Sequence, residues 1–433
     1  MERRDFLEAL GAAAVGGMMS TGITAGRGVE EWRELFPALD QEINGHRLLY
    51  LDSAATTLRP TPVIDEIARF YRTDNANPGG ALHTLARRAH QHHDDARRTV
   101  AQFINASDPS EVVFTRGTTE GINLVAAAWG SANLRAGDQI LIGLAEHSSN
   151  MIPWQMIAAR TGAELRFFGI DDDGHPLLDD LAAKLTHRTK VVAFSHVSNV
   201  LGMINPAKQM CAIARTPGRI VLVDAAQSLP HFPVDVRDLG CDFLAFSAHK
   251  MLGPMGVGVL WGRRELLDAM PPYQGGSNMA HDVDVETMHL SEGALKFGAG
   301  TPNVSGPVGL AAAMRLMRAI GQPAIRKHEL AITRHAIARL GAIPGLRLLG
   351  SLDPDEKISV FTFTVRGRQP KEVLQALDAR GIAVRAGDLA SLPLLKRIGK
   401  GVTAAVRASC YLYTTSQEID ALADQLSQRG GAG

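Results

Sequence analysis

Short apolar runs recur along the middle of the chain, and each is followed by a polar loop and then by apolar positions at helical spacing. Near-continuous runs of Val, Ile, Leu and Phe predict strands that helices cover on both faces, as in a largely parallel sheet. The predicted fold class is therefore α/β, built of repeated strand–loop–helix units. The predicted strands are Val112–Thr115, Gln139–Gly143, Leu165–Phe168, Val191–Ser195, Ile220–Val223 and Phe243–Ser247.

Helical patterns flank this region on both sides. Before it, apolar spacing predicts helices over Ile64–Tyr71 and about Thr84–Ile104, and after it, over about Val308–Ile320 and Ala324–Leu340. A smaller mixed unit completes the chain, with strands Ile358–Val365, Ile382–Arg385 and Ala404–Tyr413 and helices Pro370–Arg380 and Ser416–Ser427. We therefore expect a large domain over residues 28–305 and a small C-terminal α+β domain over residues 306–428.

The helix predicted from Thr84 carries a run of histidines and aspartates that invites a metal-site interpretation, namely His90, His92, His93, Asp94 and Asp95. Adjacent residues such as His92 and His93 do not face each other on a helix. Charges alternate with arginines here, which is typical of a solvated helix face. We predict no metal site.

Charge and cysteine content narrow the classes of function. The chain has 45 Lys and Arg against 45 Asp and Glu, so nothing favours binding to nucleic acid or to an anionic membrane surface. Three cysteines, Cys211, Cys241 and Cys410, are too few for a disulfide framework and lack metal-binding spacing. No apolar run reaches the roughly 20 residues of a membrane-spanning helix.

The first residues differ in composition from the rest. Adjacent Arg3 and Arg4, followed by Phe6 and a mild apolar stretch rich in Ala and Gly, resemble a twin-arginine export signal within residues 1–27. Such a signal predicts export to the periplasm of a folded, cofactor-loaded protein. The alternative is a disordered or helical extension on a cytoplasmic enzyme.

The predicted strand Phe243–Ser247 ends in a reactive cluster, Ser247, His249 and Lys250, before a glycine-rich turn. Desolvating a lysine ammonium is unfavourable, so a lysine at the end of a buried strand needs an explanation. A Schiff base with an aldehyde cofactor would supply one. The alternative is a lysine that reaches solvent where the strand ends.

Polar clusters follow four other predicted strands, and the carboxyl ends of parallel strands gather ligands at one edge of a sheet. Thr118 and Thr119 could cradle a phosphate at a helix start, or simply cap that helix. Asp224 could pair with a pyridinium nitrogen, or cap a helix. His147 could stack on a cofactor ring and transfer protons as a catalytic residue, or be an ordinary core histidine.

In the predicted C-terminal domain, Arg407 could hold a carboxylate through two parallel hydrogen bonds, or form a surface salt bridge. Together with the clusters above, this is the complement that pyridoxal phosphate (PLP) requires to act on an amino acid. The predicted cofactor is therefore PLP, and the predicted substrate class is a small amino acid.

From about residue 49 to the last helix, the chain resembles class-V aminotransferase-fold (fold type I) PLP-dependent enzymes, and among them the cysteine desulfurase and selenocysteine lyase branch. The resemblance is carried by seven blocks, Arg116–Asn123, Glu146–His147 with Pro153–Gln155, Ser198–Gly202, Asp224–Ser228, Ser247–Lys250, Gly300–Asn303 and Arg407–Ser409.

The resemblance implies a role for each matching residue. Lys250 would bind the cofactor covalently and act as base, Asp224 would pair with the pyridine nitrogen, and His147 would stack on the ring. The phosphate would be surrounded by Thr118, Thr119, Ser247 and His249, and the 3-hydroxyl would lie near Asn199 and Gln227. A substrate would contact Arg407, Asn199 and His83, and Thr301 would reach the phosphate of a neighbouring subunit in a homodimer.

Two departures from the family pattern stand out. The position of the family's catalytic cysteine, in a loop before a Pro-Leu pair, is occupied here by Ala390. An alanine methyl cannot carry a persulfide. Ahead of His83, Gly79 and Gly80 replace a His-Arg pair. Asp388 and Ser391 in the altered loop are candidates to contact the substrate, and Cys410 does not align with the loop.

The function predicted from these residues is a PLP-dependent lyase that cleaves a C–S or C–Se bond by elimination, without a persulfide cysteine. Cysteine desulfurase, aminotransferase and amino-acid epimerase activities use the same parts and remain alternatives. A hypothesis of another class is a non-catalytic PLP-binding protein. The base Lys250 and the carboxylate clamp Arg407 argue against it, because a pure binder needs neither.

Overall fold

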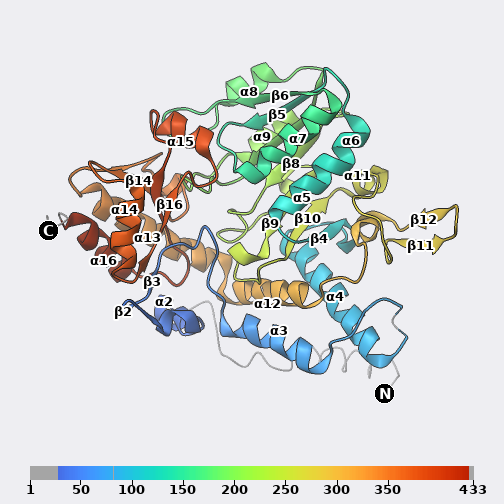
Figure 1. Ribbon diagram of the computed structural model, residues 1–433, viewed down its shortest axis with the longest axis horizontal. Helices are drawn as coiled ribbons and strands as arrows, with labels where there is room; N and C mark the ends of the chain where they lie inside the picture. The colour runs from blue at the N-terminus through green and yellow to red at the C-terminus, as the bar shows by residue number, and fades with distance from the viewer. Residues whose placement is uncertain (1–27, 81, 429–433) are drawn as a thin grey trace.

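The computed structural model describes residues 28–80 and 82–428 of the 433-residue chain. Its centre is a seven-stranded sheet in the order β4-β10-β9-β8-β7-β5-β6 (Figure 1). Only β10 runs antiparallel to its two neighbours. The strands are β4 (Val112–Thr115), β5 (Gln139–Gly143), β6 (Glu164–Phe168), β7 (Thr189–Ser195), β8 (Ile220–Asp224), β9 (Phe243–Ser247) and β10 (Gly258–Gly262). The predicted α/β fold is confirmed, and so are all six predicted strands.

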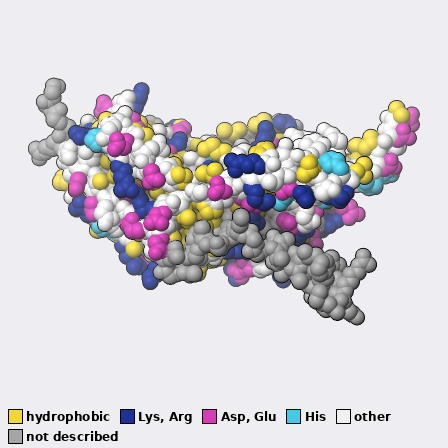
Figure 2. All heavy atoms as spheres, turned by 90° about the horizontal axis from the view of Figure 1, so that it is seen from below, with side chains coloured by type: hydrophobic (Ala, Val, Ile, Leu, Met, Phe, Trp, Pro, Cys, Tyr) yellow, Lys and Arg dark blue, Asp and Glu magenta, His cyan; other side chains and the backbone are white. Residues whose placement is uncertain are grey.

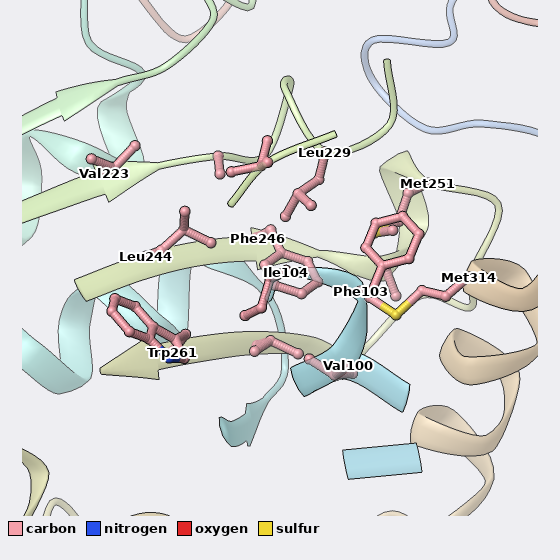
Figure 3. Packing of buried hydrophobic residues seen from close by; sticks show 14 of the residues in the cluster. Val100, Phe103, Ile104, Val223, Leu229, Leu244, Phe246, Met251, Trp261 and Met314 are labelled. Atoms are coloured by element: carbon pink, nitrogen blue, oxygen red, sulfur yellow. The ribbon is translucent and has the colours of Figure 1, made fainter. Parts of the chain in front are cut away.

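The strands contribute alternate side chains to two separate cores, because successive residues of a strand point to opposite faces. One core holds Val192, Val221, Val223 and Phe246, and the other holds their sequence neighbours such as Val191 and Leu222. Figure 3 shows part of the first core, where Val100, Phe103 and Ile104 pack among Leu244, Phe246 and Trp261.

Helices cover both faces of this sheet. The face of the first core is covered by α4 (Thr84–Phe103), α9 (Ala207–Ala214), α10 (Val236–Leu239) and α12 (Ser305–Ile320). The other face is covered by α5 (Thr118–Leu124), the π-helical turn η3 (Val125–Trp129), α7 (Ile152–Thr161) and α11 (Arg264–Ala269). Two shorter helices, α6 (Gly130–Asn133) and α8 (Leu178–Lys184), complete this part of the chain.

Two histidines of α4 lie against carboxylates, whereas His93 has an Nε2 without a hydrogen-bond partner among the described residues. His92 pairs with Asp74 and His90 with Asp94. Within the described residues, no group of three or more His, Cys, Asp or Glu side chains could hold a metal ion.

The C-terminal part folds around a four-stranded antiparallel sheet in the order β13-β14-β17-β16. These strands are β13 (Leu346–Leu348), β14 (Val360–Val365), β16 (Arg385–Gly387) and β17 (Ala405–Ser409), and the helices beside them are α13 (Gln322–Gly341), α14 (Pro370–Asp378), α15 (Leu392–Ile398) and α16 (Ser416–Ser427). This confirms the small α+β unit. The domain boundary at residue 305 stays a prediction.

One predicted strand, Ile382–Arg385, is in fact two. Residues Ile382–Ala383 form β15, which pairs in parallel with β3 (Leu49–Tyr50), whereas β16 pairs with β17. The two halves belong to different sheets, so the chain changes partner at Val384.

The N-terminal described segment, residues 28–60, lies between the two parts. It contains α2 (Val29–Arg33) and the short hairpin of β1 (Glu42–Ile43) and β2 (His46–Arg47), and α3 (Thr61–Thr73) follows it. Helix α3 packs against α12. The predicted export signal in residues 1–27 lies outside the described residues.

A hairpin of β11 (Ala280–Val283) and β12 (Met288–Leu290) projects from the body of the molecule in Figures 1 and 2. On the face in Figure 2, basic and acidic side chains are interspersed. None of the helices formed by the described residues has the length and apolar character needed to cross a membrane.

Candidate active site

A cavity of about 420 Å³ opens at the carboxyl ends of the central strands and is closed on one side by the loop after β16. This is where ligands bind in open α/β sheets. The residues predicted for the site that line it are Thr118, Thr119, His147, Asn199, Asp224, Gln227, Ser247, His249, Lys250 and Arg407.

Lys250 and Asp224 meet in this cavity because their strands are neighbours. Asp224 ends β8 opposite Ala245 of β9, and Lys250 follows β9 in a single 3-10 turn, Ala248–Lys250. Burial lowers the pKa of Lys250, and the nearby Asp224 charge opposes this shift. Burial also raises the pKa of Asp224, against the effect of Lys250. The arrangement favours a lysine amine that becomes neutral, and hence nucleophilic, more easily than usual.

The predicted phosphate cradle is a set of hydroxyls and backbone N–H groups at the start of α5. The backbone N–H of Thr118 donates to Ser247 Oγ at 2.8 Å, and the hydroxyls of Thr118 and Ser247 lie 2.7 Å apart. A Cβ on Gly258 would lie 2.5 Å from the Cα of Gly117. Glycine at position 258 therefore lets β10 approach the cradle closely.

His147 caps the turn Ser148–Asn150, with its Nδ1 accepting the N–H of Ser149 at 3.0 Å. Its proton in the neutral form is therefore on Nε2. Burial, together with the charges of Lys250 and Arg407, lowers the pKa of His147 to about 4, against the opposing effect of Asp388. The imidazole is neutral near pH 7, as a ring that stacks on an aromatic cofactor would be.

Glu146 is a buried carboxyl that the sequence interpretation noted beside His147 but assigned no role. Asn150 Nδ2 and Ser195 Oγ donate to it at 2.7 and 3.3 Å. Burial, with a smaller effect of the Asp224 charge, raises the pKa of Glu146 to about 8, against the hydrogen bonds from Asn150 and Ser195. Because Ser195 lines the cavity, its hydrogen bond to Glu146 helps to fix the position of this part of the cavity wall.

Two arginines share one carboxylate at the edge of the cavity. Arg407 is buried and donates to the Asn199 carbonyl at 2.9 Å and to Asp52 at 3.2 Å, while its Nε has no partner among the described residues. Arg385 donates to both oxygens of Asp52. Two positive charges against one negative charge leave this corner suited to a substrate carboxylate. Sequence reasoning missed Asp52 and Arg385, because this partnership joins positions 333 residues apart.

Side chains and backbone groups outside the loop that carries Ala390 donate hydrogen bonds to the carbonyl groups of this loop. Asn199 Nδ2 donates to the Leu389 carbonyl at 2.9 Å, and the N–H and hydroxyl of Ser148 donate to the Ala390 carbonyl at 2.7 and 2.9 Å. Leu389 and Ala390 both have positive φ, 53° and 55°. Such backbone is costly for residues with a Cβ, so these contacts are what hold the loop against the cavity.

All three cysteines of the sequence lie within the described residues, and all three are buried. None lines the cavity, whereas Ala390 does. Burial raises the pKa of Cys211 to about 12 and raises those of Cys241 and Cys410 well above the usual range.

Ser391, a candidate for substrate contact, is buried and is not among the residues that line this cavity, and two further predicted residues also lie outside it. His83 caps α4, its Nδ1 accepting from the N–H of Ala86, and Thr301 accepts a hydrogen bond from Asn77. Their predicted roles in a homodimer stay predictions.

Comparison with known proteins identifies the family. Residues 49–422 match the model of the class-V aminotransferases. The chain belongs to the class-V aminotransferase family. Within it, a probable cysteine desulfurase of Halalkalibacterium halodurans is 46% identical over 398 residues, which cover 92% of this chain and 97% of that protein.

Two solved structures of this family extend the likeness to three dimensions. The cysteine desulfurase CsdA of Escherichia coli matches with a TM-score of 0.84 and 35% identity, over 93% of this chain and 98% of that one. The cystine C–S lyase C-DES, solved with its reaction product cysteine persulfide, matches with a TM-score of 0.78 and 25% identity, over 91% of this chain and all of that one.

Proposed function

We propose that this chain is a PLP-dependent enzyme that cleaves the carbon–sulfur bond of cysteine or of a cysteine derivative. The observation that carries the proposal is the meeting of Lys250, Asp224, His147 and Arg407 in one cavity of a class-V aminotransferase. Among the alternatives on this scaffold, the relatives named above favour cysteine desulfurase over aminotransferase or epimerase.

The residues present fit PLP. Thr118, Thr119, Ser247 and His249 would hold its phosphate, Asp224 its ring nitrogen and Lys250 its aldehyde carbon, with Asn199 and Gln227 beside its 3-hydroxyl. The unpartnered Nε of buried Arg407 fits an anion that completes the site. When bound, PLP supplies an electron sink that stabilises negative charge at the substrate Cα.

The chain's own residues provide binding and proton transfer. Arg407, which contacts Asp52 at 3.2 Å in this structure, binds the α-carboxylate. The Nζ of Lys250, whose pKa burial lowers, takes the Cα proton. Asp224 lies beside Lys250, where it would pair with the ring nitrogen, and neutral His147 forms the facing wall.

Two routes for the departing sulfur are possible. In desulfuration through a persulfide, an enzyme thiolate attacks the substrate sulfur, the C–S electron pair stays on carbon, and the product is alanine. In elimination, the C–S pair leaves on sulfur, and the carbon skeleton becomes 2-aminoacrylate, which water converts to pyruvate and ammonia. The names of the relatives support the first route.

A specific observation favours elimination as the second candidate. Ala390 occupies the position that the family resemblance assigns to the cysteine, and the cavity lining contains no thiol. The relative C-DES, a cystine C–S lyase, supports the same route.

Product analysis separates these routes. We incubate the holoenzyme with L-cysteine and with L-cystine and quantify alanine, pyruvate and sulfide, with Lys250→Ala as the inactive control. Pyruvate that persists after all three cysteines are replaced supports elimination. Alanine whose formation requires Cys410 supports a persulfide route. Holoenzyme that cleaves no C–S bond but retains PLP supports a non-catalytic binder.

We further propose that the chain works as a homodimer in which Thr301 reaches the neighbouring phosphate site, and that residues 1–27 direct export. Light scattering of the holoenzyme that reports a monomer would refute the dimer. Cell fractionation of the wild type and of the Arg3→Lys/Arg4→Lys variant tests export. Wild-type protein that stays in the cytoplasm would refute the export proposal.

A further inference from the structure

Asp388 is a carboxylate on the cavity wall that the proposed reaction does not use. Its side chain is exposed, it lines the cavity, and it forms no ion pair within the described part of the chain. The charge of Asp388 reaches into the site, since it acts on the pKa of His147.

The position of this carboxylate is fixed by its loop. Asp388 Oδ1 accepts a hydrogen bond from the N–H of Ala390 at 3.1 Å, and the backbone carbonyl of Asp388 accepts one from the N–H of Ser391. The hydroxyl of buried Ser391 donates to the Glu146 carbonyl and to Asn199 Oδ1. Arg407 donates to the carbonyl of that same Asn199. The carboxylate anchor and the Asp388 loop are therefore joined through one residue.

The charges around the cavity are unequal at its two sides. Asp224 lies beside Lys250 and is the proposed partner of the ring nitrogen, while Arg385 and Arg407 share Asp52, which leaves one positive charge for the substrate α-carboxylate. His147 and His249 are neutral near pH 7, because burial lowers the pKa of each to about 4. Of the two carboxylates among the described residues that line the cavity, Asp224 is assigned to the ring nitrogen and Asp388 has no assigned partner.

The α-ammonium of an amino acid cannot serve as this partner, because the α-amino group reacts with the PLP aldehyde. The partner has to be a second cation on the same substrate. Ala390, with only a methyl group beside Asp388, leaves room on this wall for a substituent on the substrate sulfur.

We infer that Asp388 selects cysteine derivatives whose sulfur carries a cationic substituent, such as an aminoethyl group. Anionic substituents are repelled by the same carboxylate. The inference rests on the proposed function and names the substrate class of that site.

Three compounds of similar size test the selection: S-(2-aminoethyl)-L-cysteine, S-propyl-L-cysteine and S-carboxymethyl-L-cysteine carry a cation, a neutral group and an anion. We measure kcat/KM for each compound with the wild-type holoenzyme, with Asp388→Asn and with Asp378→Asn. The last variant is the control, since it makes the same change from carboxylate to carboxamide at an exposed position on α14. For each compound, kcat/KM of the variant is divided by that of the wild type, so the different reactivities of the three thiolate leaving groups cancel.

Asp388→Asn should lower kcat/KM for the aminoethyl compound about tenfold, mainly by raising KM. It should change kcat/KM for the propyl compound by less than about twofold and should raise kcat/KM for the carboxymethyl compound. Asparagine can still accept the N–H of Ala390, so the loop stays in place. Asp378→Asn should change none of the three.

Equal changes for all three compounds, accompanied by a shifted pH profile, would overturn the inference and show that Asp388 acts through His147. No change for any compound would also overturn it while leaving the proposed function intact. If the holoenzyme cleaves none of the three compounds, their affinities are measured by calorimetric titration instead, and the proposed function is decided separately by the cleavage of L-cysteine and L-cystine. Cation-selective binding that Asp388→Asn abolishes supports the inference, and equal affinities overturn it.

Discussion

At the scale of single residues, the clearest consequence concerns the thiols. Cys211, Cys241 and Cys410 are buried, and burial holds their pKa values far above neutral pH, so they are poor nucleophiles. We expect the native protein to react with less than about 0.2 equivalents of a thiol reagent such as DTNB. Ala390→Cys should raise this to about one equivalent, since position 390 lines the cavity.

Full denaturation should release three reactive thiols in the wild type, as the sequence requires. Native wild-type protein that reacts rapidly at one thiol would contradict the burial of the cysteines. Mass spectrometry would then identify which cysteine reacted.

A second residue-scale prediction concerns acid stability. His196 is 8% exposed, packs edge-on against Phe232, and has an Nδ1 without a partner among the described residues. Burial lowers the pKa of His196 from 6.5 to about 4. Between these values the unfolded chain binds the proton and the folded chain does not, so the free energy of unfolding falls as pH falls from about 6.5 to 4.

His196→Gln, which cannot titrate, should flatten this dependence by up to about 1.4 kcal/mol per pH unit. Denaturant titrations at pH 7, 6 and 5 measure the slope. An exposed histidine, His187, offers the matched control as His187→Gln. An unchanged slope in His196→Gln would mean that His196 is protonated in the folded protein.

Single residues also show how far sequence reasoning reaches. Lys250 and Asp224 were predictable because each ends a recognisable buried strand, and the ends of parallel strands gather at one edge. Asp52 and Arg385 were not, because their importance arises only when the N-terminal segment meets the C-terminal sheet. His83 and Thr301 stay predictions, because their expected partner is another subunit.

At the scale of elements, strong apolar runs identified the parallel strands, but β10 was missed. It is five residues long, begins and ends in glycine, and follows a glycine-rich turn that reads as loop. Only its pairing with β4 and β9 makes it a strand. In the same way, β15 and β16 looked like one strand because pattern alone does not show a change of partner.

The close approach of β10 to the cradle makes Gly258 sensitive to substitution. A Cβ there would lie 2.5 Å from Gly117 Cα and 2.6 Å from the Phe246 carbonyl, and backbone atoms cannot move aside cheaply. Gly258→Ala should cost about 1–3 kcal/mol of unfolding free energy and weaken PLP retention. Denaturant unfolding and the PLP content after dialysis measure both effects.

Gly275→Ala is the matched control, because a Cβ at Gly275 has no heavy atom within 4 Å. It should leave both quantities unchanged. If Gly258→Ala behaved like Gly275→Ala, β10 would have to lie farther from Gly117 than described, and the cradle would not depend on this contact.

At the scale of the whole molecule, the N-terminal segment holds the two sheets together around the site. Strand β3 pairs with β15, and Arg33 forms an ion pair with Glu418 of α16. The segment also contacts the large domain, where Gln227, in the turn after β8, donates to the Ala54 carbonyl at 2.7 Å. The cavity therefore has walls from three separate stretches of chain, which explains why it is complete only in the folded whole.

Asp52 is the charged centre of this connection, and Asp52→Asn tests it. The substitution keeps the shape of the side chain but removes the negative charge that Arg385 and buried Arg407 share. Breaking a buried ion pair leaves an uncompensated charge and costs about 3–5 kcal/mol in the unfavourable limit. We expect denaturant unfolding to show a loss of about 2–4 kcal/mol, whereas Asp40→Asn, an exposed control in the same segment, should change little.

The same variant separates stability from substrate binding. Removal of Asp52 leaves Arg407 unrestrained by its carboxylate but more available to an anion, so a ligand carboxylate should recover part of the lost stability. Adding a saturating amino-acid ligand should therefore raise the thermal midpoint of Asp52→Asn more than that of the wild type. An equal rise in both would mean that Arg407 does not exchange Asp52 for the ligand carboxylate, and that Asp52 acts only as a structural link between the N-terminal segment and the C-terminal sheet.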